Sequence, residues 1–277
     1  MRVRSPSHPA PAGNCPFPQR RARLAGTAVG CVALAALLTG TAATAAESAA
    51  TKPRTALGVA VVALKSPYAG YKTDTLAAPV GSWEGKSFYF RGGTLGYRLL
   101  DNQHTEVSVM LSPYMMRFKH NESDDLRLRQ LSNRNFSAMA GVAVRHNAAW
   151  GLLQADVQRE ISGHGGGLSA DAKYAYPLPV GRVTLVPGVG ASYASSRLND
   201  YYFGVSAAEA ARSGLARYRA GSGVAPYVDL LAVMPLGPRW TATASLRRTL
   251  LSDAVDDSPM TDAEHMDSAA LSLSYGF

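Results

Sequence analysis

The sequence predicts an all-β protein, an antiparallel transmembrane β-barrel of about ten strands with short periplasmic turns and long extracellular loops. Three observations lead to this fold class. An export leader opens the chain, apolar residues alternate with small or polar ones, and long connections alternate with short ones. No apolar run reaches the roughly 18 residues of a membrane helix, which excludes an α-helical membrane protein.

The leader has the order of a secretory signal peptide. Arg20, Arg21 and Arg23 precede the apolar run 24–38, and small residues at 43–45 form a cleavage pattern. We therefore expect a signal peptide over 1–46, a periplasmic segment over 47–56 and a barrel over 57–277. Without the leader, 23 basic residues face 20 acidic ones, so nucleic-acid binding is not indicated. The destination predicted for the chain is the outer membrane of a Gram-negative cell.

The strands are expected where alternation is regular and turn residues flank it. Because the first two are the least defined, twelve strands is the alternative count. The ten expected ranges are 57–66, 86–100, 104–114, 136–145, 148–158, 167–176, 182–194, 223–234, 239–249 and 265–277. A tight turn is expected at His146-Asn147, and a long loop over 67–85.

Alternation also assigns the two faces of the strands. In 168–176, Leu168, Ala172 and Tyr174 share the face expected toward lipid, while Asp171 and Lys173 share the inner face. Alternation alone also fits a soluble sandwich, so loop lengths are what favour the membrane barrel. Because single inward charges are costly, we expect an interior network of paired residues: Asp156, Asp171, Lys173, Asp229 and Arg247.

A long loop between two expected strands carries a family signature. It contains Tyr201-Tyr202-Phe203-Gly204-Val205, Ala208-Glu209-Ala210, Ser213-Gly214-Leu215, Tyr218 and Ala220-Gly221; supporting matches are Ser66-Pro67-Tyr68, Phe88-Tyr89-Phe90-Arg91-Gly92 and Asp257-Ser258-Pro259. From about Leu57 to Phe277 the chain resembles the MltA-interacting protein family, also called MipA/OmpV. The signature residues taken from this resemblance are Tyr201, Tyr202, Phe203, Gly204, Glu209, Gly214, Tyr218 and Gly221.

The resemblance implies an outer-membrane β-barrel, and the lack of a catalytic constellation separately predicts that the protein is not an enzyme. The resemblance also implies a scaffold that brings a lytic murein transglycosylase together with a peptidoglycan synthase. Other members resemble surface adhesins or narrow pores. A surface adhesin or a narrow pore without a murein role is therefore the alternative function. Further expected partners are outer-membrane lipid, lipopolysaccharide and the barrel-assembly machinery.

The carboxy-terminal strand resembles the signature by which outer-membrane barrels are recognised for insertion. The residues of this assembly signal are Leu271, Leu273, Tyr275 and Phe277.

The signature loop also predicts a short helix. Ser206 and Glu209 have capping-box spacing, residues 207–211 favour helix, and Gly214 suits a C-terminal cap. This element is either a partner-binding or lumen-folding piece or a compact surface loop.

No catalytic, metal or cofactor site is predicted. The five histidines beyond the leader are scattered, and the glycines around His164 indicate a flexible loop tip rather than a phosphate site. The acids of 253–264 match no calcium loop. A basic loop either binds lipopolysaccharide phosphates or offsets Asp124 and Asp125; its residues are Arg117, Lys119, Arg127, Arg129 and Arg134.

Overall fold

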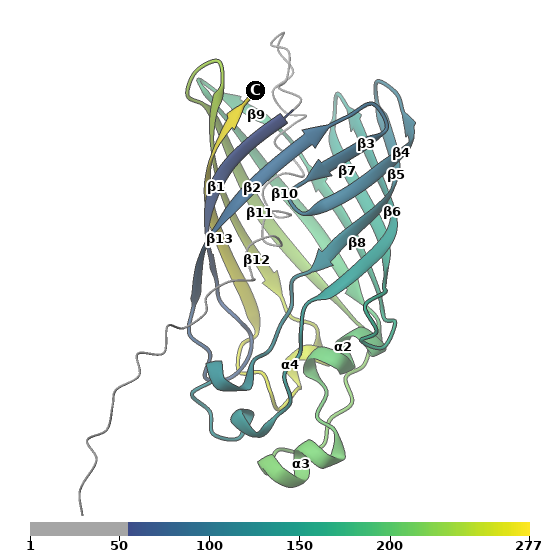
Figure 1. Ribbon diagram of the computed structural model, residues 1–277, viewed down its shortest axis with the longest axis vertical. Coiled ribbons are helices and arrows are strands. Elements are labelled where there is room, and N and C mark those ends of the chain that lie inside the picture. Colours follow the sequence, from purple (N-terminus) through teal and green to yellow (C-terminus); the bar gives the residue numbers. More distant parts are fainter. Residues whose placement is uncertain (1–54) are drawn as a thin grey trace, which may run out of the picture.

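The chain is a closed antiparallel β-barrel of twelve strands, seen in a computed structural model that describes residues 55–277 (Figure 1). Strands that follow each other along the chain pair around the wall, and the first strand, β1, pairs with the last, β13, so the ring is complete. The expected leader and most of the segment 47–56 lie outside the described residues, but Thr55 and Ala56 already belong to the first strand.

The wall is built from strands of very different length. They are β1 (Thr55–Leu64), β2 (Asp74–Glu84), β3 (Phe88–Arg91), β4 (Thr94–Asp101), β5 (Thr105–Tyr114), β6 (Ser137–Ala148), β7 (Gly151–Glu160), β8 (Leu168–Ala175), β9 (Leu178–Val180), β10 (Val183–Ala194), β11 (Gly223–Pro235), β12 (Trp240–Leu250) and β13 (His265–Gly276). The three-residue β9 follows β8 and pairs with the same strand, β10. Because β8 and β9 together form one strand of the wall, the thirteen segments make twelve barrel strands.

The alternative count of twelve is correct, and the ten-strand count is wrong because the region 67–100 was misread. The expected strand 86–100 is two strands, since Gly92 and Gly93 adopt positive φ and turn the chain between β3 and β4. The expected long loop 67–85 contains β2. Pro79 within β2 is the residue that weakens a strand pattern there.

The predicted position of one tight turn is also wrong. His146 and Asn147 lie inside β6 and pair with Leu153 and Leu152 of β7. The chain turns instead between Ala148 and Gly151, where Gly151 has φ +133°.

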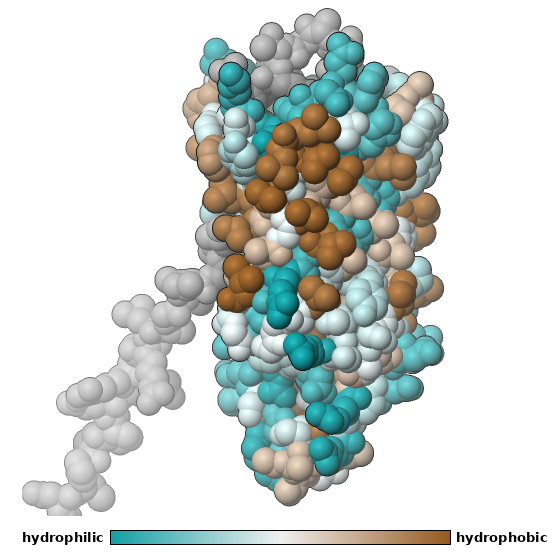
Figure 2. All heavy atoms as spheres, turned by 90° about the vertical axis from the view of Figure 1, so that its right-hand side faces the viewer, coloured by the Kyte–Doolittle hydropathy of each residue, from teal (hydrophilic) through white to brown (hydrophobic). Residues whose placement is uncertain are grey.

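The outer surface is apolar over the strands. Val59 and Leu271 are 63% and 64% exposed, and their inward neighbours Ala60 and Ala270 are buried. Figure 2 shows apolar side chains gathered over one side of the wall, with hydrophilic residues toward the long-loop end. Such a band is what a lipid-facing barrel surface requires. Among residues 55–277, no helix is long and apolar enough to cross a membrane.

The long connections gather at one end of the barrel and carry all the described helices (Figure 1). These are the 3-10 helices η1 (His120–Glu122) and η2 (Leu128–Gln130) and the α-helices α2 (Ser196–Phe203), α3 (Ala207–Ser213) and α4 (Asp253–Asp256). The carboxy-terminal residue and the short turns lie at the opposite end. We call the packed loops the cap.

Candidate functional site

The signature loop connects β10 to β11 and folds into α2 and α3. The predicted helix is confirmed: Ser206 caps α3 with a complete capping box with Glu209, and Gly214 ends it in the left-handed conformation at φ +72°. The sequence analysis did not predict α2, which contains Tyr201, Tyr202 and Phe203 of the signature.

Aromatic residues of the signature anchor the cap. Tyr202 and Phe203 are almost fully buried, and the hydroxyl of Tyr68 donates a hydrogen bond to the Tyr202 carbonyl at 3.2 Å. Burial raises the pKa of Tyr202, so its hydroxyl stays protonated and shares a hydrogen bond of 2.7 Å with Ser137. The ring of Tyr201 stacks on His164 with centroids 4.5 Å apart.

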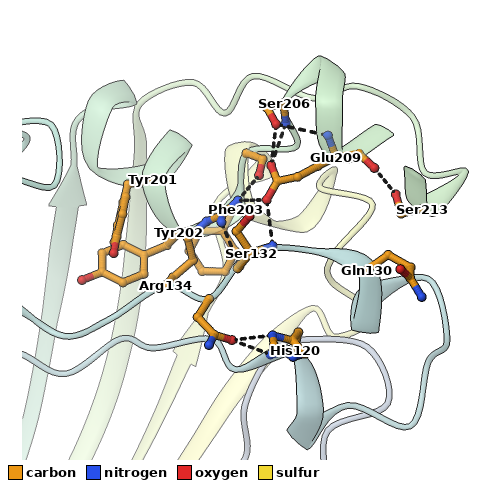
Figure 3. A network of polar contacts seen from close by, with 12 residues as sticks. His120, Gln130, Ser132, Arg134, Tyr201, Tyr202, Phe203, Ser206, Glu209 and Ser213 are labelled. Atoms are coloured by element: carbon orange, nitrogen blue, oxygen red, sulfur yellow. Dashed lines mark hydrogen bonds and ion pairs between the residues drawn. The ribbon is translucent and has the colours of Figure 1, made fainter. Parts of the chain in front are cut away.

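Glu209 is the polar centre of the cap (Figure 3). Its carboxylate accepts hydrogen bonds from the backbone of Ser132 and Ser206, both at 3.0 Å, and pairs with Arg134 at 2.9 Å. Burial alone would raise the pKa of Glu209, but these hydrogen bonds and the guanidinium of Arg134 lower it to about 2. Arg134 also donates to the carbonyl of Gly204, which joins the β5–β6 loop to the signature loop.

The remaining signature residues complete the same junctions. Tyr218 donates from its hydroxyl to the Ala254 carbonyl in α4 at 3.1 Å, and the Gly221 carbonyl accepts from Asn199 at 2.9 Å. The signature loop is thereby linked to the β5–β6 and β12–β13 loops. The structure brings all eight signature residues into one packed cap, while their functional role stays a prediction.

The charged loops are internally paired. Each of the five basic residues of the β5–β6 loop forms an ion pair with a carboxylate: Arg117 with Asp74 and Glu122, Lys119 with Glu122, Arg127 with Asp125, Arg129 with Asp124, and Arg134 with Glu209. Of the two interpretations left open, this geometry favours neutralisation within the protein. In residues 55–277, no three His, Cys, Asp or Glu side chains gather as a metal site.

The glycine-rich loop after β7 surrounds an anion supplied by the chain itself. Glu160, which is buried, accepts hydrogen bonds from the backbone of Ser162, His164 and Gly166 at 2.5 to 2.9 Å. Positive φ angles at Gly163, Gly165 and Gly166 aim these groups inward. The loop tip is thus organised around an internal carboxylate.

The lumen of the barrel contains part of the expected charge network; Lys173, Asp229 and Arg247 form ion pairs, whereas Asp156 accepts a hydrogen bond from Gln158. Asp229 pairs with Lys173 at 2.5 Å and with Arg247 at 3.2 Å. Asp171 accepts hydrogen bonds from Ser192 at 2.6 Å and from Tyr227 at 2.8 Å. The inward orientation predicted for Asp171 and Lys173 is confirmed by these contacts.

A second lumenal network lies near the short-turn end and was missed by the sequence analysis. Arg91 forms bidentate contacts with Glu84 and Glu106, and Arg98 binds the same two carboxylates. The available signal was the presence of both acids and arginines in 84–106, and the wrong strand boundaries hid that they share the inner face. Between the two networks lies a polar cavity of about 300 Å³.

The predicted assembly signal lies on the outer face of β13. Leu271 and Phe277 are exposed, and Tyr275 contacts both Trp240 and Phe277 with ring centroids 5.1 Å apart. Arg239 donates a hydrogen bond to the Tyr275 hydroxyl at 2.7 Å. The role of these residues in assembly stays a prediction.

Comparison with known proteins assigns the chain to a family. The model of the family "MltA-interacting protein MipA" matches residues 57–277. The chain belongs to this family. Among relatives, the putative outer membrane protein YiaT of Escherichia coli O157:H7 is 35% identical over 230 residues, 83% of this chain and 94% of that protein.

Two further relatives carry names that bear on location and partners. The MltA-interacting protein of Escherichia coli K12 is 33% identical, over 85% of this chain and 95% of its own length. The outer membrane protein OmpV of Vibrio cholerae is 30% identical over 46% of this chain and 49% of its own length. The resemblance inferred from the signature loop is therefore confirmed, and this MipA family member is an outer-membrane barrel.

Proposed function

We propose that this protein is a non-catalytic outer-membrane scaffold that binds a lytic murein transglycosylase on the periplasmic side and brings it to a peptidoglycan synthase. The observation that carries the proposal is the similarity to the MltA-interacting protein over 95% of that relative's length. In this proposal the short turns and the carboxy terminus face the periplasm and the cap faces outward.

The two ends of the barrel differ in a way that supports this orientation. The short-turn end presents exposed apolar residues beside basic ones: Trp150, Leu178, Val180 and Leu236 with Lys86, Arg182 and Arg239. An exposed apolar patch with a polar rim is typical of a binding surface. At the cap, large apolar residues such as Tyr68, Phe118 and Met260 are buried against each other.

Two other functions are the alternatives. A narrow pore is disfavoured by the packed cap and by the paired charges of the lumen, although the cavity leaves room for a solute. An adhesin would bind through the outward cap. Neither alternative requires contacts at the short-turn end.

Binding to a purified lytic murein transglycosylase tests the proposal. The full chain is immobilised in detergent, and we expect retention of the enzyme. Leu236→Glu, at the β11–β12 turn, should weaken retention about tenfold because it places a charge in the apolar contact.

Leu126→Glu is the control, since Leu126 is also an exposed leucine but lies in a cap loop. It should retain the enzyme as the parent chain does. Loss of binding in Leu126→Glu but not in Leu236→Glu would reverse the orientation. Absence of retention together with steady conductance in a planar bilayer would replace the scaffold with a pore.

A further inference from the structure

The barrel wall is interrupted between β2 and β5. The two strands between them form a short hairpin, and β3 pairs with only three residues of β2, Ser82 to Glu84. Beyond the hairpin turn at Gly92, residues 74–80 of β2 pair with β1 alone among the described strands. On the other side, residues 112–114 of β5 pair with β6 alone. Two strand edges therefore face each other across an opening.

The opening is widest next to the hairpin turn. Neighbouring strands lie about 4.8 Å apart, so β2 and β5 are separated there by three such steps, about 14 Å. The opening closes toward the cap, where Asp74 lies 3.5 Å from Arg117 and Tyr71 forms a bridge with Ser123. Just beyond β5, Met115 packs against an inward-facing cluster that contains Ala60.

Two prolines lie on the edges that border this opening. The Gly81 carbonyl accepts from the Gly92 amide on the hairpin side, so Pro79, two residues away, also directs its backbone to that side. In β5, the Thr105 carbonyl accepts from Asn102, which by the same alternation directs the backbone of Pro113 to the opening. Proline has no amide hydrogen and is suited to an unpaired edge.

The opening joins two environments of opposite polarity. Val59, Val61 and Leu111 are exposed on the outer wall beside it, at the depth of the apolar band. Behind it, the lumenal cavity is lined by Thr94 and Ser112 of the rim and by charged residues deeper inside. A molecule that lies in both environments must be amphipathic.

The charge around the cavity further defines the ligand. Five basic and five acidic side chains lie in its lining or pair with it: Arg91, Arg98, Arg145, Lys173 and Arg247 with Glu84, Glu106, Asp156, Asp171 and Asp229. Asp156 and Asp171 are opposite each other in the β7–β8 register, so two carboxylates lie side by side on the cavity wall. This balance favours a zwitterionic head whose ammonium group lies near these two carboxylates.

We propose that the opening is a lateral portal at which a zwitterionic phospholipid of the surrounding bilayer places its head group in the lumenal cavity. The acyl chains stay outside against the edges of β2 and β5. A cavity of about 300 Å³ is at the lower limit of small-molecule pockets and accommodates a head group rather than a whole lipid. This inference does not depend on binding of a murein enzyme.

Photolabelling of the full chain in phosphatidylethanolamine nanodiscs tests the portal. The probe is phosphatidylethanolamine with a diazirine at the glycerol end of one acyl chain, and labelled residues are mapped by mass spectrometry. We expect labels on inward Thr94 and Ser112 as well as on outward Leu111. Inward Thr243 and Ser272, which pair across the uninterrupted β12–β13 wall, should stay unlabelled.

A blocking variant makes the test specific. Thr94→Trp should lower labelling of Ser112 about tenfold, because the larger side chain overfills the entrance. Thr243→Trp is the matched control and should leave that labelling unchanged. Heat-modifiable electrophoretic mobility shows that each variant forms a barrel.

Several results would overturn the portal. They are labels on outward residues only, equal labels on Ser112 and Thr243, or undiminished labelling in folded Thr94→Trp. Strong protection of the Thr75 and Ala77 amides from hydrogen exchange, without lumenal labelling, would instead assign the β2 edge to an added polypeptide strand.

Discussion

The cap and the lumen of this barrel bury opposite kinds of side chain. In the cap, Tyr68, Phe118 and Met260 are at most 1% exposed and pack together. In the lumen, the side chains of Lys173 and Asp229 are each 10% exposed and are held by an ion pair. The strands must present apolar residues to lipid and keep polar ones inside, whereas the loops fold around an apolar core as a soluble domain does.

The two regions also satisfy their carboxylates differently. Glu209 in the cap is matched by backbone amides and by Arg134. Asp229 in the lumen is bound through Oδ2, while its buried Oδ1 has no hydrogen-bond partner among residues 55–277. Of these two carboxylates, Glu209 is therefore the better satisfied.

The largest expected effect is in the apolar core of the cap. Phe118→Ala should cost the cap about 3–5 kcal/mol, because it leaves a cavity where a fully buried ring was packed. Protease cleavage of the β5–β6 loop should accelerate while heat-modifiable mobility of the barrel is retained. If the whole barrel unfolds instead, the cap is not an independent unit.

The next effect compares the two faces of one strand. Ala172 of β8 points to lipid and Ser169 points inward, since Asp171 and Lys173 share its face. Ala172→Arg should cost about 2–4 kcal/mol in a reversible folding titration into lipid vesicles, and Ser169→Arg much less. Equal costs would contradict the assigned faces.

Acid should loosen the cap through Glu209. The pKa of this carboxyl is lowered to about 2, so its contribution is complete above the ordinary value near 4.5 and is lost as the pH falls toward 2. The charged hydrogen bonds involved contribute about 1.5–3 kcal/mol. Protection of the Ser132 and Ser206 amides from hydrogen exchange should fall over this range. In Glu209→Gln that pH dependence should be absent.

The smallest effect on stability is expected from surface cysteines that report orientation. Asp256 in α4 and Gly237 in the β11–β12 turn are both exposed and lie at opposite ends. Asp256→Cys should change stability by less than about 0.5 kcal/mol, whereas Gly237→Cys should cost about 1 kcal/mol because Gly237 has φ +155°. An impermeant thiol reagent should label Asp256→Cys but not Gly237→Cys on intact cells. The reverse pattern would place the cap in the periplasm.

The sequence predicted the fold class, most strands, the inward charges and the capped helix α3, because each depends on local alternation or spacing. It failed where pairing decides the structure. Gly92 and Gly93 turn the chain within a range whose alternation suggested one strand, and β2 is held by ten residues of β1 despite Pro79. The Arg134–Glu209 contact joins residues 75 apart, so no local pattern indicates it.

Two tyrosines of the lumen lie flat against glycines of the neighbouring strand. Tyr89 is opposite Gly96 and Tyr227 is opposite Gly190, and a Cβ on either glycine would come within 2.4 Å of the ring. The guanidinium groups of Arg91 and Arg247 lie over the rings of Tyr89 and Tyr227, 4.0 and 4.1 Å from the centroids. In related proteins, each glycine and its opposite tyrosine should therefore be replaced together. A larger side chain at the glycine position should accompany a smaller one at the tyrosine position.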